Sequence, residues 1–185
     1  EKKLLVFVGR LAAEKEIHTL RPMMDRRDDV ALAIVGDGPY RGELEELFAG
    51  TRTTFPGFME GNELASAFAS SDAFVFPSVT ETLGLVILEG MASGLPVVAA
   101  RSGPTMEQVT DGVDGLLYDS GDQASLDAAL TRLGDAQLRG RIRKAARAEA
   151  VRWAESAKEA LAPLPEGIVK ESLFEFADSV VSRSR

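Results

Sequence analysis

The sequence predicts an α/β protein with a doubly wound parallel sheet, and two patterns support this prediction. Short runs that are apolar throughout, such as residues 3–9, 30–35 and 73–76, alternate with segments whose apolar residues recur at helical spacing. Strands that are apolar throughout are typical of parallel sheets, which helices cover on both faces. Right-handed crossovers then make the sheet doubly wound and place its ligand crevice at the carboxyl ends of the strands.

Strands and helices alternate along most of the chain. Glycine or proline follows four of the strands, at Gly9, Gly36, Gly57 and Pro77, and marks their carboxyl ends. The expected strands cover residues 3–9, 30–35, 52–55, 73–76, 96–100 and 115–118. The expected helices cover residues 16–27 and 40–48, a segment capped by Asn62, a segment that begins near Gly84, and residues 122–134 and 135–162.

The chain divides into two parts near residue 162. Residues 1–162 are long enough for one well-buried domain. Residues 163–185 begin with prolines and a glycine and continue with apolar residues at helical spacing between Ile168 and Val181. We expect this C-terminal helical tail to pack on the domain or on a missing partner. The chain starts almost inside a strand and without an initiator methionine, so we expect it to be a piece of a longer protein.

Composition excludes several kinds of protein. The formal net charge of −8 argues against a nucleic-acid binder, whose surface needs a basic excess. The absence of cysteine excludes disulfide scaffolds and thiolate metal sites. The single histidine, His18, excludes a histidine cluster for zinc and is expected at the surface. No apolar run approaches the roughly 18 to 20 residues of a membrane span.

Residues 81–89, ETLGLVILE, are the most informative stretch of the chain. They follow a buried strand and place a helix start near Gly84, with carboxylates on either side at Glu81 and Glu89. A helix start has free N–H groups and a partial positive charge, so it suits a phosphate. Glu89 lies about a turn and a half into the helix, where its carboxylate can accept hydrogen bonds from sugar hydroxyls. The stretch therefore indicates a nucleotide-sugar site.

The loop after the first strand supplies two cations. Gly9 lets the backbone approach a ligand closely, and Arg10 and Lys15 can clamp a diphosphate from the side opposite the helix start. The alternative is a solvated turn with two ordinary surface cations. No Asp-x-Asp sequence occurs in the chain, which disfavours a diphosphate held by a metal. We therefore expect neither a metal nor a cofactor.

Two other strand ends can form the pocket for the base. Gly36 and Asp37 follow the second strand, where they form either one wall of this pocket or only a tight turn. Phe58 and Met59 follow the third strand. Backbone groups of that loop can read the edge of a uracil while one of these side chains packs nearby.

Two patterns have a competing interpretation. Glu81 and Glu89 match the paired carboxylates of a glycosidase in residue type, although their separation cannot be read from the sequence. The basic stretch in residues 139–147 is typical of a solvated helix face, and contact with anionic lipid headgroups is the alternative.

Together these residues resemble the C-terminal, donor-binding domain of retaining GT-B glycosyltransferases, a family that includes sucrose synthases, glycogen synthases and lipid mannosyltransferases. The resemblance extends from about Leu4 to Trp153. Within the family, residues 36–41, 81–91 and 93–101 are most similar to sulfolipid synthases and related glycolipid-forming enzymes. The resemblance implies that residues 1–162 are the Rossmann-like, nucleotide-sugar-binding half of a GT-B fold, with a UDP-sugar as the donor.

The resemblance also implies a role for each matching residue. Arg10 and Lys15 would hold the diphosphate and offset the charge on the leaving group, and Glu81 would meet the donor sugar. Glu89 would bind the ribose hydroxyls, and residues 58–59 would contact the base. The donor-binding residues implied in this way are Gly9, Gly36, Asp37, Phe58, Met59, Thr82, Leu83, Gly84, Leu85 and Glu89.

The family's N-terminal domain, which carries the acceptor site, is missing from this chain. We therefore expect the chain alone to be inactive, while the complete protein transfers a sugar to an acceptor such as a lipid. Such a protein would be cytoplasmic, with peripheral contact to the inner face of a membrane. Two alternatives remain open, namely a stand-alone nucleotide-sugar-binding module and one half of a nucleotide-sugar epimerase.

Overall fold

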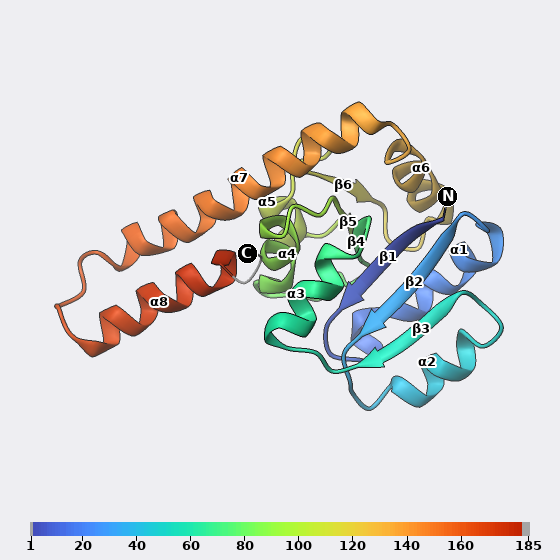
Figure 1. Ribbon diagram of the computed structural model, residues 1–185, viewed down its shortest axis with the longest axis horizontal. Helices are drawn as coiled ribbons and strands as arrows, with labels where there is room; N and C mark the ends of the chain where they lie inside the picture. Colours follow the sequence, from blue (N-terminus) through green and yellow to red (C-terminus); the bar gives the residue numbers. More distant parts are fainter. Residues whose placement is uncertain (1, 183–185) are drawn as a thin grey trace.

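The computed structural model describes residues 2–182 and contains a parallel sheet of six strands (Figure 1). The strand order, β3-β2-β1-β4-β5-β6, is that of a doubly wound Rossmann-like sheet, so the predicted fold class is confirmed. β1 and β4 are neighbours at the point where the order reverses. The strands are β1 (Lys3–Val8), β2 (Val30–Val35), β3 (Thr53–Gly57), β4 (Ala73–Phe76), β5 (Val97–Ala100) and β6 (Gly115–Tyr118).

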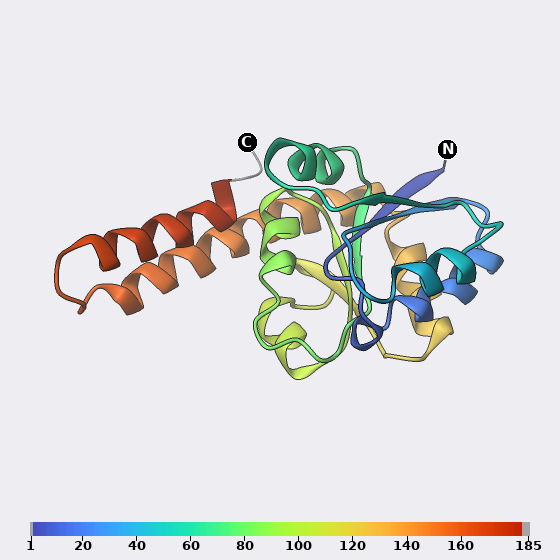
Figure 2. The ribbon, with the colours of Figure 1, turned by 90° about the horizontal axis from the view of Figure 1, so that it is seen from below.

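Helices cover both faces of the sheet, as Figure 2 shows. α1, α2 and α6 lie on one face, and α3, α4 and α5 lie on the other. The long helix α7 packs on α4 and also contacts β6. The helices are α1 (Arg21–Arg26), α2 (Arg41–Leu47), α3 (Gly61–Ala69), α4 (Leu85–Ala92), α5 (Gly103–Gln108), α6 (Gln123–Arg132), α7 (Ala136–Leu161) and α8 (Ile168–Ser182).

The core holds α4 firmly against the centre of the sheet. Every residue of β4, β5 and β6 is buried. Phe74 of β4 makes ring contacts with Phe68 and Phe76, at centroid distances of 5.9 and 5.8 Å. Gly90 of α4 lies directly over this ring, since a Cβ there would be 3.0 Å from it. This close packing fixes where α4 begins relative to the ends of β1 and β4.

The structure corrects two of the expected helices and adds one. Residues 16–27 do not form one helix, because Glu16 takes a left-handed conformation (φ 53°) and separates two 3-10 turns, Ala13–Lys15 and Ile17–Leu20, which precede α1. Asn62 does not cap α3, which begins one residue earlier and has Glu60 at its cap. Helix α5 was not predicted, although its capping serine and early proline are typical start signals.

The tail forms helix α8, which turns back along α7 and also contacts α4 (Figure 1). The C-terminal half of α7 and helix α8 project from the sheet domain as a hairpin. Residue 1 of the expected domain and residues 183–185 of the expected tail lie outside the described residues. None of the helices in residues 2–182 is long and apolar enough to cross a membrane.

The basic stretch in residues 139–147 lies on the first half of α7. Arg143 donates to the carbonyl of Gly94 at 2.9 Å, and Arg147 donates to the carbonyl of Ala92 at 3.2 Å. Ala92 is the last residue of α4, whose C-terminal end carries a partial negative charge, and Gly94 lies two residues beyond it. These two arginines therefore stabilise the end of α4 on the side away from its start.

Candidate functional site

The loops after β1 and β2 are tied together at the carboxyl end of the sheet. The N–H of Leu11 donates to the carbonyl of Asp37 at 2.9 Å, and the N–H of Tyr40 donates to the carbonyl of Leu11 at 3.0 Å. Gly36 has a positive φ of 136°, and a Cβ on it would lie 1.9 Å from the carbonyl oxygen of Gly9. Only glycine allows the two backbones to approach this closely.

A partly buried ion pair joins the loops that follow β1 and β4. Lys15 pairs with Glu81, and both side chains are largely buried, with 20% and 16% exposed. Thr80 donates to the carbonyl of Glu14 at 3.0 Å and ties the same loops together. The two strands are neighbours where the strand order reverses, which is where ligands bind in such sheets. The tertiary structure thus places Lys15 at this point of the crevice, with Glu81 as its partner.

Arg10 is placed differently from Lys15. Its side chain is 65% exposed, and its guanidinium lies 3.8 Å from the carboxylate of Glu14, on its own loop. A pair of this kind is weak in water because solvent screens it. Arg10 is therefore free to exchange Glu14 for another anion at little cost.

The start of α4 presents free backbone donors. Gly84 caps the helix in a left-handed conformation (φ 56°). Within residues 2–182, no group accepts a hydrogen bond from the backbone N–H groups of residues 82–86. We call these five N–H groups the amide cluster. Consecutive free N–H groups at a helix start are suited to an anion.

The two predicted carboxylates lie on opposite sides of the amide cluster in the chain. Glu81 immediately precedes it, and Glu89 lies in the second turn of α4 with a half-buried side chain. Their use as a glycosidase pair stays untested. Within the described residues, no three acidic or histidine side chains gather as they would around a metal ion.

A cavity of about 380 Å³ opens beside the ends of β1, β2 and β3. This volume is within the range of small-molecule sites, about 300 to 1,000 Å³. Phe58 stands at its edge with 70% of the residue exposed, and Glu60 contributes a carboxylate that no sequence pattern singled out. The cavity brings together predicted donor-binding residues Gly9, Gly36, Asp37, Phe58 and Met59 with Arg10.

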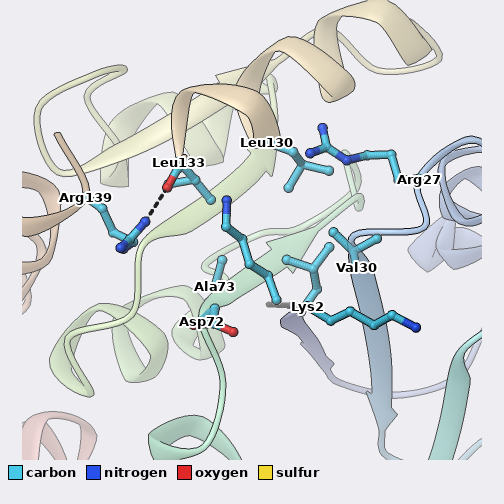
Figure 3. Close-up of a pocket in the computed structure, with 10 residues that line it drawn as sticks. Lys2, Arg27, Val30, Asp72, Ala73, Leu130, Leu133 and Arg139 are labelled. Atoms are coloured by element: carbon cyan, nitrogen blue, oxygen red, sulfur yellow. Dashed lines mark hydrogen bonds between the residues drawn. The ribbon is translucent and has the colours of Figure 1, made fainter. Parts of the chain in front are cut away.

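A smaller cavity of about 190 Å³ lies at the opposite, amino end of the sheet (Figure 3). Most of its charged side chains form hydrogen bonds within the protein. Arg27 binds Asp29 through two hydrogen bonds, which keep the pKa of that carboxyl below its ordinary value of 3.8. Asp72 accepts from a backbone N–H of β1 at 2.7 Å, and Arg139 donates to the carbonyl of Leu133 at 2.6 Å. The carboxyl end of the sheet is therefore the candidate site.

Sequence reasoning missed one residue that touches the amide cluster. Gln108, the last residue of α5, donates a hydrogen bond to the carbonyl of Leu83 from 25 residues away. His18, by contrast, lies exposed in a 3-10 turn beside Tyr40, outside the crevice. A sequence pattern could not have found Gln108, because its partner is brought to it only by the packing of α5 under the loop.

Comparisons with known proteins agree with this geometry. The model of the family described as "Glycosyl transferases group 1" matches residues 1–149. Sulfoquinovosyl transferase SQD2 of Arabidopsis thaliana is 45% identical over 157 residues, which cover 83% of this chain and 31% of the relative. A GDP-mannose-dependent alpha-(1-6)-phosphatidylinositol dimannoside mannosyltransferase of Mycobacterium tuberculosis is 34% identical over 166 residues, covering 87% of this chain and 43% of the relative.

Solved structures give the same result. The crystal structure of HepE from Anabaena, in complex with UDP and glucose, matches with a TM-score of 0.77 and 29% identity. The match covers 88% of this chain and 49% of HepE. The chain thus spans between about a third and about half of the length of these relatives. Since the family model covers most of the chain and the fold is that of GT-B neighbours, the chain belongs to the family of glycosyl transferases group 1.

Proposed function

We propose that this chain is the donor-binding half of a retaining glycosyltransferase that takes a sugar from a UDP-sugar and transfers it to a lipid acceptor. The amide cluster at the start of α4 is the main support, because its five free N–H groups lie where the strand order reverses. Such a group of donors suits an anion, and a nucleoside diphosphate supplies one. HepE, which has this fold, was solved with UDP and glucose.

Each part of the crevice then has a role toward the donor. The amide cluster, Lys15 and Arg10 hold the diphosphate, and Glu81 orients both the ammonium of Lys15 and the donor sugar. Glu89 accepts hydrogen bonds from the ribose hydroxyls. The base lies in the 380 Å³ cavity, where the exposed ring of Phe58 can stack on it.

Catalysis in this proposal is electrostatic. When the nucleoside diphosphate leaves the anomeric carbon, negative charge grows on its phosphate oxygens. Preorganised N–H donors and the cations of Lys15 and Arg10 stabilise that charge more strongly than the charge of the bound substrate. The donor domain needs neither a protein base nor a metal for this step.

The acceptor would bind only to the complete protein. A second, N-terminal domain would carry the acceptor site, so that the cleft forms between the two halves. A lipid acceptor is supported by the mycobacterial relative, whose name specifies a phosphatidylinositol dimannoside. The complete protein would then work in the cytoplasm, at the inner face of a membrane.

A GDP-sugar is the second candidate donor. Several relatives are named as GDP-mannose-dependent, including one from Corynebacterium glutamicum that is 42% identical over 118 residues. Glu60, at the edge of the base cavity, could accept hydrogen bonds from the two neighbouring N–H donors of a guanine. A uracil offers one such donor between two carbonyls.

Calorimetric titration of the chain with UDP, GDP and ADP, each with and without EDTA, tests the proposal. We expect UDP to bind most tightly and EDTA to have no effect. Tighter binding of GDP would favour the second candidate. Loss of binding in EDTA would overturn the metal-free clamp, and no binding of any nucleotide would overturn the proposed function.

A further inference from the structure

Helix α5 contacts the loop of the amide cluster through Gln108. This residue is 4% exposed, and its Nε2 donates a hydrogen bond to the carbonyl of Leu83. Its Oε1 is buried and has no hydrogen-bond partner among the described residues. The same oxygen would lie 3.4 Å from a Cβ placed on Gly84. One side chain thus contacts both residues at the centre of the cluster.

The hydrogen bond to Leu83 fixes the direction of the N–H group that follows it. A trans peptide is planar, so its C=O and N–H groups point in opposite directions. When Gln108 holds the Leu83 carbonyl on the α5 side, the N–H of Gly84 must point away from α5. As a glycine without a Cβ, Gly84 also has more freedom in its backbone dihedral angles than other residue types. Without Gln108, this peptide plane would lose the only described partner of its carbonyl.

The unpaired oxygen distinguishes Gln108 from a residue that only fills space. A buried polar atom without a partner destabilises the fold, and an apolar side chain of the same length would avoid that loss. The fold tolerates the cost of the unpaired oxygen, which indicates that the N–H group of Gln108 has a role of its own.

From these observations we infer that Gln108 is a positioning residue for phosphate binding. It orients the Leu83–Gly84 peptide so that the amide cluster points into the crevice. This inference rests on the proposed function, because it takes the cluster as the phosphate site. It adds a residue that lies outside the crevice and touches no ligand itself.

Replacing Gln108 by methionine tests this role, since methionine keeps the length but has no N–H donor. The readouts are the affinities for UDP and for pyrophosphate by calorimetry, and the melting temperature. We expect Gln108→Met to weaken both ligands by roughly three- to tenfold, the effect of one neutral hydrogen bond. The melting temperature should change little, because loss of the hydrogen bond to Leu83 offsets removal of the unpaired oxygen.

Gln108→Glu adds a pH-dependent readout, because an ionised carboxylate both lacks the N–H donor and places a negative charge beside the amide cluster, and Gln108→Met measures loss of the donor alone. An ionised carboxylate cannot donate to the Leu83 carbonyl, whereas a protonated one can. Pyrophosphate binding, relative to the parent chain at each pH, should therefore be weak at neutral pH and recover as the pH falls. An affinity ratio independent of pH would overturn the positioning role.

Thr105→Val is the matched control. Thr105 is on the same helix, is fully buried, and donates to the carbonyl of Ala100 at 2.7 Å, but it does not contact the amide cluster. Its loss should lower the melting temperature and leave both affinities unchanged.

The outcomes separate this inference from the proposed function. If the parent chain binds neither UDP nor pyrophosphate, the proposed function itself fails. If the parent binds but Gln108→Met binds equally well, only the positioning role fails. A loss in Thr105→Val as large as that in Gln108→Met would show general destabilisation and would also overturn the inference.

Discussion

Replacing Lys15 by methionine should weaken UDP binding by roughly 10- to 150-fold. A hydrogen bond between charged groups contributes about 1.5 to 3 kcal/mol, and each 1.4 kcal/mol is a factor of ten in affinity. The full range applies because only 20% of the Lys15 side chain is exposed, so water screens its charge little. Methionine keeps the apolar part of the side chain, which separates loss of charge from loss of packing.

The partner of Lys15 makes the prediction sharper. Without the ammonium, Glu81 remains as a partly buried, unpaired carboxylate beside the phosphates, and like charges repel. Lys15→Met should therefore weaken UDP more than the double variant Lys15→Met/Glu81→Gln does. The two substitutions should be strongly non-additive, as expected for residues in direct contact.

The assay is calorimetric titration of UDP and pyrophosphate against the parent, both single variants and the double variant. Lys158→Met is the control, since Lys158 is also ion-paired but lies on α7, with Asp178 of α8 as one partner. It should leave UDP affinity unchanged. Equal UDP affinity of the parent and Lys15→Met would refute the reasoning. So would purely additive effects, in which the fold-loss of affinity in the double variant equals the product of the fold-losses in the two single variants.

Four further outcomes are expected. Glu89→Gln should weaken UDP more than pyrophosphate, since only UDP has ribose hydroxyls; equal losses would make Glu89 structural. Gly36→Ala should destabilise the fold by about 2 to 4 kcal/mol through strain and overpacking, which lowers Tm by roughly 4 to 16 °C, whereas Gly140→Ala, with nothing within 4 Å, should not destabilise it. Asp29→Asn should lower the urea midpoint at neutral pH. The pKa of Asp29 is lower in the folded than in the unfolded state, so the ionised carboxylate stabilises the fold at any pH above its unfolded-state pKa. The difference between variant and parent should vanish as the pH falls through the folded-state pKa, which is below 3.8. The chain alone, given a UDP-sugar and candidate lipids, should transfer no sugar until the missing half is supplied, and robust transfer by the chain alone would contradict this.

Local sequence patterns were informative where burial alone decides the structure. Strands that are apolar throughout can be stable only between two layers of helices, and the six expected strands appear in the structure with ends shifted by no more than two residues. Helix boundaries were less predictable. Glu16 adopts a left-handed backbone that no propensity favours, and this conformation breaks the helix expected over residues 16–27.

The sequence by itself determined the fold class and the two stretches that form the crevice, because glycines at strand ends and a helix start have local signatures. Only the tertiary structure decided how the stretches meet. Lys15 and Glu81 are 66 residues apart and pair because β1 and β4 are neighbours in the sheet. Gln108 reaches Leu83 because α5 packs under the loop. Contacts of this kind depend on strand order and helix packing, which arise from the burial of the whole core and leave no mark in the spacing of the residues they join.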